Sequence, residues 1–354
     1  MRDGDILVLK GSEVLSLLSG QEQEIIDVVR TAYETHAQQE TSLPHSTFLR
    51  FPNNPRNRII ALPSYLGGQF ALAGMKWISS FPGNLELGLE RASAAMILNS
   101  TSTGRLKAIV EGSVISAKRT AASAALAAQV LHRGNVTRAG LIGTGRINFE
   151  IVRFLRAVYP ELNHFVVFDL SDARATQFAR KCESVFQGVT IEPVKDLESV
   201  LKSSSLLSFA TTALTPYVPD LSVCAPATTI LHVSLRDLMT EAILASDNIV
   251  DDIDHVCRAE TSIHLVEQIM GNRDFVRGTL AEVMNGTAPA KTNANDITVF
   301  SPFGLGILDV AIGKFVCDRA NALQTGTCLD SFPAASWLEE PVQRVEASPN
   351  GASH

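Results

Sequence analysis

The 354-residue chain lacks long apolar runs, runs of basic residues and low-complexity tracts. Its alanine-rich segment, Thr120 to Leu131, is too short to cross a bilayer. A formal net charge of −7 and the absence of a lysine or arginine stripe argue against a nucleic-acid partner. The chain starts with MRDGDILVLKGSEV, whose early acidic groups and short apolar stretch are not those of a signal peptide. We therefore expect a cytoplasmic globular enzyme without a membrane or nucleic-acid partner.

The cysteines are few, odd in number and dispersed, and no pair has the C-x-x-C spacing of a zinc or redox site. Such a set predicts reduced thiols inside a cell rather than a disulfide framework. We expect all of them to be structural or incidental, and we predict no metal site. They are Cys182, Cys224, Cys257, Cys317 and Cys328.

The first third of the chain predicts helices combined with strands. An apolar stripe over residues 13–39 is typical of one amphipathic helix. Short apolar runs predict strands over 58–66 and 70–82, and 92–112 has the pattern of a strand, a turn and a strand. Alanine dominates residues 113–131, which predicts a helix that Ser116 can cap.

From about residue 134 apolar runs alternate with helical patterns. The runs predict strands at 139–142, 164–170, 190–194, 206–212, 228–235 and 248–252. Helices are expected over 171–185 and 196–204, and a last helix follows residue 298. Strands alternating with helices predict a parallel, doubly wound α/β sheet. The proline-bearing tail, 329–354, is expected to be weakly ordered.

The segment GLIGTGRIN joins a predicted strand to a predicted helix and carries the G-x-G of a dinucleotide-binding, Rossmann-type turn. Gly143 would make the tight turn, and Gly145 would let the backbone approach a diphosphate at the helix N-terminus. The surrounding residues Thr144, Arg146 and Ile147 are predicted to line this cofactor site. Asn148 occupies the third position, where a small residue is usual, so it would loosen the helix packing or add a polar group near the cofactor.

An acidic residue follows the second strand at the spacing typical of a ribose ligand. Asp169 lies 169 − 143 = 26 residues after Gly143. A carboxylate there binds ribose hydroxyls and repels a 2′-phosphate, which favours NAD as the cofactor. Arg174 is the one neighbouring group that would suit the phosphate of NADP. Thr211 and Thr212, at the end of the fourth strand, are predicted to contact the cofactor or to cap the strand locally.

Basic residues in apolar surroundings mark the first part of the chain. Arg50, Lys76 and Arg119 each sit in an apolar or β-like context, and a substrate carboxylate is their natural counter-ion. Any single one would more often be a solvated surface charge. His45 is equally compatible with substrate binding and with an ordinary loop. We expect Lys118 to lie at the surface, because it points elsewhere on the helix that carries Arg119.

These pieces together resemble the ornithine cyclodeaminase/mu-crystallin family over about residues 43–318. The motifs that carry the resemblance are GMKWISSFPGN, STSTGRLKAIVEGSVISAKRTAASAALAA, GLIGTGRIN, FATTALTPYV, HVSLRDL and TVFSPFGLGILDVA. The resemblance implies a homodimer and a substrate and dimerisation lobe of α+β class, 1–133, completed by the C-terminal helix, 305–325. It also implies a Rossmann domain, 134–304.

The resemblance further implies roles for single residues. Positions matching Arg50, Lys76 and Arg119 bind the substrate carboxylate, and Asp237 matches an acid–base aspartate. The motifs are most similar to the branch that oxidises N-(2-amino-2-carboxyethyl)-L-glutamate in siderophore or antibiotic 2,3-diaminopropionate biosynthesis. Cyclodeaminases usually carry proline, glycine and lysine after the aspartate, whereas DLMTEAI follows here.

The expected chemistry is NAD-dependent loss of hydride from a carbon that bears an amine and a carboxylate. The imine then hydrolyses to 2-oxoglutarate and 2,3-diaminopropionate. Lys76 and Asp237 are the predicted catalytic residues, Asp237 as the base, although an aspartate before a helix is also a common cap. Arg236 would meet a further substrate carboxylate or lie at the surface. Asp309 could contact the cofactor or cap the last helix, and the cap is the expectation.

Two other functions remain open at this point. One is a related reaction of the same family, such as ornithine cyclodeamination, amino-acid dehydrogenation or ketimine reduction. The other is nucleotide binding without catalysis.

Overall fold

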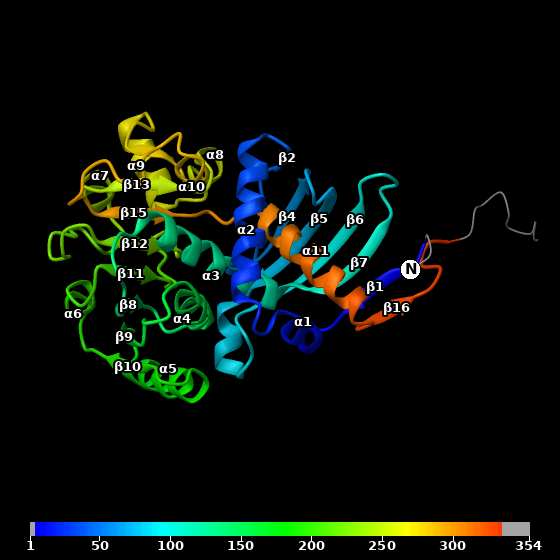
Figure 1. Cartoon of the computed structure of the whole chain (residues 1–354), viewed down its shortest axis with the longest axis horizontal. Helices are drawn as coiled ribbons and strands as arrows, with labels where there is room; N and C mark the ends of the chain where they lie inside the picture. Colours follow the sequence, from blue (N-terminus) through cyan, green and yellow to red (C-terminus); the bar gives the residue numbers. More distant parts are fainter. Residues whose placement is uncertain (1–3, 335–354) are drawn as a thin grey trace, which may run out of the picture.

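Two eight-stranded sheets form the core of the chain, whose computed structural model describes residues 4–334 (Figure 1). Sheet A is mixed: β1 and β7 are parallel, and its other pairs are antiparallel. In spatial order its strands are β16 (Thr327–Leu329), β1 (Ile6–Leu9), β7 (Leu106–Glu111), β6 (Ala92–Ser100), β5 (Leu72–Ser80), β4 (Asn54–Leu66) and β2 (Thr41–Ser42), with β3 (Thr47–Phe51) also paired to β4.

Sheet B is parallel throughout and confirms the predicted doubly wound fold. Its spatial order is β10 (Thr190–Pro193), β9 (His164–Phe168), β8 (Arg138–Ile142), β11 (Leu206–Phe209), β12 (Thr229–His232), β15 (Thr298–Ser301), β13 (Asp247–Val250) and β14 (Val276–Thr279). The strand order reverses between β8 and β11. Ligands bind at the carboxyl edge of such sheets near this reversal.

Helices cover both sheets and connect them. Sheet A carries α1 (Gly11–Leu18), α2 (Glu22–Ala37) and α11 (Gly306–Ala322), so the C-terminal helix completes the N-terminal part as predicted. Around sheet B lie α4 (Arg146–Val158), α5 (Asp172–Val185), α6 (Leu197–Leu201), α7 (Thr240–Leu244), α8 (Ile253–Val256), α9 (Ser262–Met270) and α10 (Leu280–Met284). The long α3 (Gly112–Leu131) lies between the two sheets (Figure 1). A short 3₁₀ helix, η1 (Pro82–Leu87), follows β5.

The single helix predicted over 13–39 is wrong, because two helices meet there at Gly20. That glycine has φ +71°, a left-handed conformation that ends a helix. The predicted cap of α3 is wrong as well. Glu111 caps the helix by accepting hydrogen bonds from the backbone N–H groups of Ser113 (2.8 Å) and Val114 (3.1 Å). Ser116 lies inside α3 and accepts a hydrogen bond from Lys76 Nζ at 3.1 Å instead.

Several short strands were not predicted. β14 and β15, of four residues each, lie outside the predicted strands. β16 pairs with β1 across almost the whole chain length, so no local pattern announces it. The predicted weakly ordered tail therefore begins in a strand, and its part from 335 to 354 lies outside the described residues. The limits predicted for the two domains stay predictions.

Lys118 is buried, and its predicted surface position is wrong. Its side chain is 3% exposed, and Nζ lies 3.2 Å from Glu150 Oε2 on α4. Most of α3 is buried among neighbouring helices and strands, including the face that carries Lys118. In the part of the chain from 4 to 334, no helix is both long and apolar enough to cross a membrane.

Candidate active site

The glycine turn lies where the order of sheet B reverses. Gly143 follows β8 with φ +88°, and its N–H donates to Phe168 O on β9 at 2.8 Å. A Cβ at this position would come within 2.5 Å of Ala210 O, just beyond β11. The turn passes so close to the next strand that only glycine fits, which is the role predicted for Gly143.

Gly145 is a glycine that the fold itself does not need. It is the N-cap of α4 in extended conformation, with no side-chain cap, and a Cβ there would meet nothing within 4 Å. Open space above a helix N-terminus with free N–H groups is the environment that a diphosphate requires. Arg146 is exposed and Ile147 half-buried at the start of this helix. The local geometry therefore fits a dinucleotide cofactor.

Asp169 directly follows β9 and lies beside the glycine turn. Its Oδ2 accepts hydrogen bonds from the backbone N–H (3.0 Å) and the hydroxyl (2.6 Å) of Thr144, and Oδ1 accepts one from Ser171 N. Burial acts to raise the pKa of Asp169, but these hydrogen bonds outweigh it and hold the pKa below its ordinary value. The carboxylate is therefore ionised and fixed next to the loop that would carry the diphosphate.

Asn148 stabilises the turn from beneath. The side chain is fully buried, and Nδ2 donates to Ile142 O (3.0 Å) and Gly143 O (2.6 Å). Its Oδ1 accepts a hydrogen bond from Ser208 on β11 at 2.8 Å. In this structure the side chain is bound to the protein directly beneath the turn, and its contact with a cofactor stays a prediction. The residue joins the turn to β11 and replaces the small third residue of the motif by a polar link.

A buried carboxylate joins two of the predicted substrate-binding cations. Asp309, in the first turn of α11, lies with Oδ2 at 2.7 Å from Lys76 Nζ and Oδ1 at 3.2 Å from Arg119 Nε. All three side chains are less than a tenth exposed. The predicted capping role of Asp309 is therefore wrong. Two cations facing one carboxylate leave a surplus positive charge at this centre.

The surplus charge shows in the titration of Lys76. Burial and the neighbouring Arg119 guanidinium lower the pKa of Lys76 to about 8, while Asp309 acts in the opposite direction. Asp309 therefore does not fully offset the effects of burial and of Arg119 on Lys76. An anionic ligand beside it would supply further negative charge.

Arg119 reaches the carboxyl edge of sheet B. A Cβ on Gly304, just beyond β15, would lie 2.7 Å from Arg119 Nη1. The backbone N–H groups of Phe303 and Gly304 donate to Asp251 at 2.8 Å each, which fixes this loop, and Gly304 has φ +90°. The loop thus needs glycine both for its conformation and for its approach to the guanidinium. Through α3, the cation centre of sheet A meets the edge of sheet B where a cofactor would lie.

Asp237 follows β12 and is the centre of a hydrogen-bond network. It accepts hydrogen bonds from Thr211 Oγ1, from Ser234 Oγ and, at 3.1 Å, from Tyr217 OH. His232 Nε2 lies 3.3 Å from its Oδ2. Burial acts to raise the pKa of Asp237, but these partners outweigh it and the pKa lies below its ordinary value.

The carboxylate of Asp237 has no exposed surface. Just beyond the end of β11, the Thr211 hydroxyl donates its hydrogen bond to Asp237. The neighbouring Thr212 is exposed. Tyr217, 41% exposed, is the most exposed residue of this network.

Two further predicted residues do not join the cation centre. His45 is exposed, and its ring centroid lies 5.5 Å from that of His255. Arg50 is exposed on β3, with its guanidinium 5.6 Å from the centroid of the Phe48 ring. Neither residue shares a hydrogen bond with Lys76 or Arg119 within the described part of the chain.

Arg236 is positioned by the backbone of another loop. Its side chain donates to Ala259 O and, through Nε at 2.8 Å, to Glu260 O. Its positive charge lowers the pKa of Arg58 in sheet A, as do the charges of Arg91 and Arg50. Arg58 and Arg91 are basic residues that the sequence reasoning missed, because a charge at a strand end normally indicates only an exposed edge.

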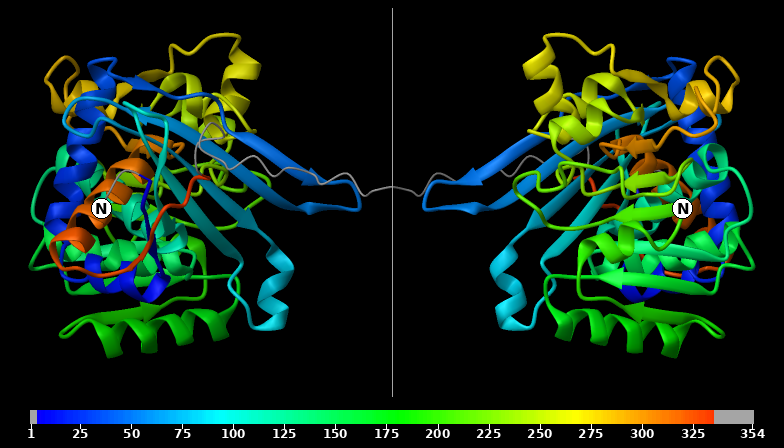
Figure 2. Two further views of the ribbon diagram at one scale, coloured as in Figure 1. Left: turned by 90° about the vertical axis from the view of Figure 1, so that its right-hand side faces the viewer. Right: turned by 90° about the vertical axis from the view of Figure 1, so that its left-hand side faces the viewer.

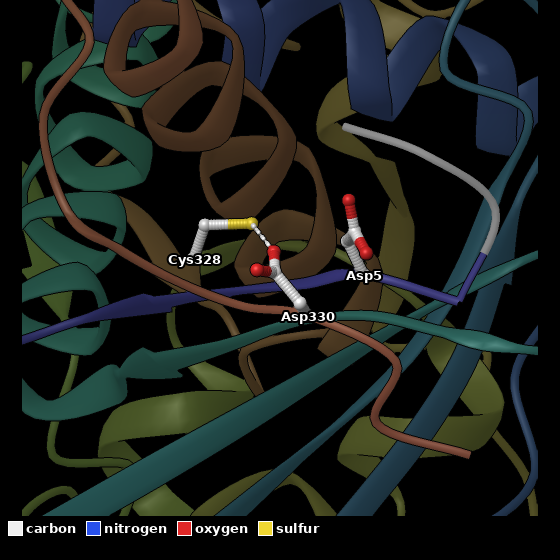
Figure 3. A group of neighbouring side chains, drawn as sticks. All are labelled: Asp5, Cys328 and Asp330. Atoms are coloured by element: carbon white, nitrogen blue, oxygen red, sulfur yellow. Dashed lines mark hydrogen bonds between the residues drawn. The ribbon is translucent and has the colours of Figure 1, made fainter. Parts of the chain in front are cut away.

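Three side chains away from this region could hold a metal ion by distance alone. Asp5, Cys328 and Asp330 lie at the β1–β16 edge (Figure 3). Cys328 Sγ donates to Asp330 Oδ1 at 3.7 Å, and burial together with both acidic charges raises the pKa of the thiol. A protonated thiol is a poor metal ligand, and the group is mostly exposed. We assign no metal to it.

The cysteines are all free, as predicted. Burial raises the pKa of Cys182, Cys257 and Cys317 to about 12 and that of Cys224 to about 11. Thiols that stay protonated near neutral pH are weak nucleophiles. These positions are therefore structural.

Known proteins share this architecture over nearly the whole chain. The model of the ornithine cyclodeaminase/mu-crystallin family matches residues 6–324. The chain is 25% identical over 336 residues to N-((2S)-2-amino-2-carboxyethyl)-L-glutamate dehydrogenase of Staphylococcus aureus, covering 93% of this chain and 99% of that protein.

Two solved structures are similar in three dimensions. One is the Δ1-pyrroline-2-carboxylate reductase of Thermococcus litoralis in complex with NADH and L-proline, with a TM-score of 0.85 and 26% identity, covering 91% of this chain and 99% of that one. The other is an archaeal alanine dehydrogenase dimer with bound NAD, with a TM-score of 0.82 and 27% identity, covering 92% and 99%. These likenesses confirm the predicted fold class.

The lowered pKa of Lys76 predicts a specific pH dependence of stability. Between about pH 8 and 10.5, the ordinary pKa of a lysine, folded Lys76 has released its proton while the unfolded chain still binds one. Stability contributed by this group therefore rises with pH across that window. The unfolding free energy of the wild type relative to Lys76→Met should increase by on the order of 3 kcal/mol over this range.

Urea titrations at several pH values measure this difference. Lys195→Met serves as the control, because that lysine is exposed and pairs only with Asp172 at the surface. A wild-type minus Lys76→Met difference that stays constant over the window would show that the lysine titrates normally.

Proposed function

The chain belongs to the ornithine cyclodeaminase/mu-crystallin family, and from that premise we propose that it is an NAD-dependent oxidoreductase of an N-substituted amino acid. The proposed reaction oxidises N-(2-amino-2-carboxyethyl)-L-glutamate and yields 2-oxoglutarate and 2,3-diaminopropionate, a precursor for siderophores or antibiotics. The carrying observation is the surplus positive charge of the Lys76–Asp309–Arg119 centre beside Gly304 at the edge of sheet B. Its reduced cysteines are consistent with action in the cytoplasm.

The residues around the glycine turn fit NAD. The N–H groups at the start of α4 would hold the diphosphate above Gly145, and the ionised Asp169 would accept hydrogen bonds from the adenosine ribose. Asp169 would also repel the 2′-phosphate of NADP. Thr212, exposed at the end of β11, would lie beside the nicotinamide end. When bound, NAD⁺ accepts the hydride of the substrate.

The cation centre would orient the substrate. Arg119 uses only Nε for Asp309 among the hydrogen bonds of the described residues, so its terminal nitrogens remain for a carboxylate. Holding the α-carboxylate there would place the α-carbon near the carboxyl edge of sheet B, an orientation effect that can lower a barrier by several kcal/mol. Asp309 fixes both cations in place and limits their repulsion.

Lys76 is better suited than Asp237 to accept the substrate's ammonium proton. Its pKa of about 8 in the unliganded protein gives a neutral Nζ near physiological pH, which would donate an N–H to the substrate carboxylate as an amine while Arg119 supplies the positive charge. Asp237 is buried, already accepts three hydroxyl hydrogen bonds, and has a lowered pKa that makes it a weak base. We therefore assign the proton transfer to Lys76. Asp237 would act as a positioning residue that orients Thr211 and the exposed phenol of Tyr217.

A homodimer is the assembly that sheet A supports. One face of the sheet packs on helices, while the opposite face presents Leu49 (46% exposed), Trp77 (40%) and Tyr65 (39%). Trp77 lies directly opposite Ala61 and Ala95 in the neighbouring strands, which gives a broad surface of low polarity. Such a patch is typical of a protein interface. We place the dimer contact on this face.

Turnover with NAD⁺ tests the proposed reaction. One NADH and one 2-oxoglutarate should form for each N-(2-amino-2-carboxyethyl)-L-glutamate consumed, measured by absorbance and an enzymatic 2-oxoglutarate assay. Lys76→Met should lower kcat/KM by about 100- to 10,000-fold, because a proton acceptor and a carboxylate ligand are lost together. Lys195→Met is the matched control at an exposed lysine and should leave kcat/KM unchanged.

Other outcomes would point to the other functions. Proline and ammonia formed from L-ornithine without net NADH would identify a cyclodeaminase. Binding of NAD⁺ with no turnover of N-substituted glutamates, ornithine, lysine or alanine would indicate a nucleotide-binding protein.

The two glycines of the turn should respond differently to alanine. Gly145→Ala should leave the urea-unfolding free energy unchanged but raise the Kd for NAD⁺ about 10-fold or more, because the new methyl group enters the space for the diphosphate. Gly143→Ala should cost about 1–3 kcal/mol of stability, because the left-handed turn and Ala210 O both exclude a side chain. Unchanged NAD⁺ affinity of Gly145→Ala would place the diphosphate elsewhere.

Sedimentation tests the dimer. The wild type should sediment with twice the 38.1 kDa mass of the chain, and Trp77→Glu should shift it to the monomer by placing a charge in the apolar interface. Ile269→Glu makes the same kind of change at a 67% exposed residue of α9 and should leave the mass unchanged. A dimer that persists in Trp77→Glu, or a monomeric wild type, would contradict this assignment.

A further inference from the structure

A second group of basic side chains lies on the same face of sheet A as Lys76. Side chains two and four residues apart on a strand share a face, so Lys76 and Ser80 of β5 point the same way. Arg58 lies directly opposite Ser80 in the sheet, and Arg50 lies opposite Arg58. The distance along β5 from Lys76 to the row of Ser80 is four residues, or about 13 Å between Cα atoms.

An apolar row separates the two sets of charges. Ile78 lies between Lys76 and Ser80 on β5, with Ile60 and Ala94 directly opposite it in the neighbouring strands. All three are partly exposed. The face therefore offers a cation, an apolar strip and further cations in succession. A ligand with two anionic ends joined by methylene groups has this pattern.

Arg91 adds a second guanidinium at the far end. It precedes β6, its backbone C=O accepts a hydrogen bond from Phe81 N at 2.8 Å, and its Nη2 donates to Ser80 Oγ at 3.3 Å. The Nε atoms of Arg58 and Arg91 are both buried without a hydrogen-bond partner. A buried N–H donor without a partner is costly, so each of these positions calls for an acceptor.

The charges of this group are not neutralised by the protein. Within residues 4–334 no carboxylate forms an ion pair with Arg58 or Arg91. Burial and the charges of Arg91, Arg236 and Arg50 lower the pKa of Arg58, which reflects like charges close together. Single surface arginines are normally solvated and need no explanation. Half-buried guanidinium groups that lie close together without an anion do need an explanation.

Arg236 comes from the sheet B side, and the residues around it have strained backbone conformations. Arg236 follows Leu235, which has φ +69°, and its side chain is held by Ala259 and Glu260, with φ +53° and +57°. Left-handed conformations are unfavourable for residues other than glycine and persist where the surroundings impose them, often at functional sites. These hydrogen bonds hold a third guanidinium near enough to Arg58 for its charge to lower the pKa of Arg58.

We propose that Arg58 and Arg91, faced by Arg236, form a second carboxylate subsite that binds the distal carboxylate of the substrate, while Lys76 and Arg119 hold the α-carboxylate. This inference rests on the proposed function and narrows it to substrates with at least two carboxylates. The methylene groups between them would pass over Ile60 and Ile78.

The subsite also selects against other amino acids. The side-chain ammonium of ornithine or lysine would face Arg58, Arg91 and Arg236 and be repelled. The methyl group of alanine would not reach them. A ring such as that of pyrroline-2-carboxylate carries no second anion to satisfy the buried Nε atoms. The positively charged subsite thus favours a dicarboxylate substrate over these other amino acids.

Binding of two matched 2-oxo acids to the enzyme–NADH complex tests the subsite. 2-Oxoglutarate and 2-oxopentanoate have the same chain, and the second has a methyl group in place of the distal carboxylate. NADH fluorescence should show 2-oxoglutarate bound about 10- to 100-fold more tightly by the wild type. Arg58→Gln and Arg91→Gln should each remove most of this preference while leaving 2-oxopentanoate and NADH affinity within about twofold.

Controls separate the subsite from net charge and from the rest of the site. Arg138→Gln makes the same charge change at the amino end of β8, where the arginine pairs with Glu192, and should keep the preference. Lys76→Met should weaken both 2-oxo acids equally.

Three outcomes would overturn the proposal. Equal affinity of the wild type for both acids contradicts the subsite, and so does a preference that survives in both Arg58→Gln and Arg91→Gln. Absence of binding by either acid to the NADH complex overturns the proposed function and the subsite with it.

Discussion

The buried carboxylate of Asp309 holds together elements that are far apart in the sequence. It receives Lys76 from β5 and Arg119 from α3, and it stands on α11. Each ion is costly to bury alone, so the three side chains are stable there only together. The C-terminal helix is therefore fixed on sheet A by charge as well as by apolar packing. Because two cations share one carboxylate, the assembled centre still attracts an anion.

The topology of sheet B supplies the other half of the site. A parallel sheet brings the carboxyl ends of its strands to one edge, so residues after β8, β11, β12 and β15 gather there. Gly143, Thr211, Asp237 and Gly304 occupy these four positions. The close approach of Gly304 to Arg119 joins this edge to the cation centre. Figure 2 shows the β3–β4 hairpin and η1 projecting from the body on the same side of the molecule.

Much of the fold was predictable because its signals are local. The alternation of strands and helices predicted the parallel sheet, and the glycine spacing located the turn at Gly143. Apolar surroundings singled out Lys76 and Arg119, and both are buried at one centre. β14, β15 and the β1–β16 pair escaped prediction, the pair because it depends on contacts between distant segments.

The parts of the site that could not be predicted depend on burial. Asp309 looks like a helix-start aspartate in the sequence, and only the packing of α11 on β5 turns it toward Lys76. Lys118 looks like a surface lysine until α4 covers it with Glu150. Arg58 and Arg91 come together by strand register, through Ser80. Arg50 lies at the surface because β3 pairs only with β4 in sheet A, and His45 is exposed in the loop between β2 and β3.

A crystal structure of the protein with NADH and 2-oxoglutarate tests the central claim most directly. The account predicts the carboxylate next to the keto carbon within hydrogen-bond distance of the Arg119 guanidinium and Lys76 Nζ, with the keto carbon facing the nicotinamide ring. An intact Lys76–Asp309–Arg119 centre with that carboxylate bound elsewhere would contradict it.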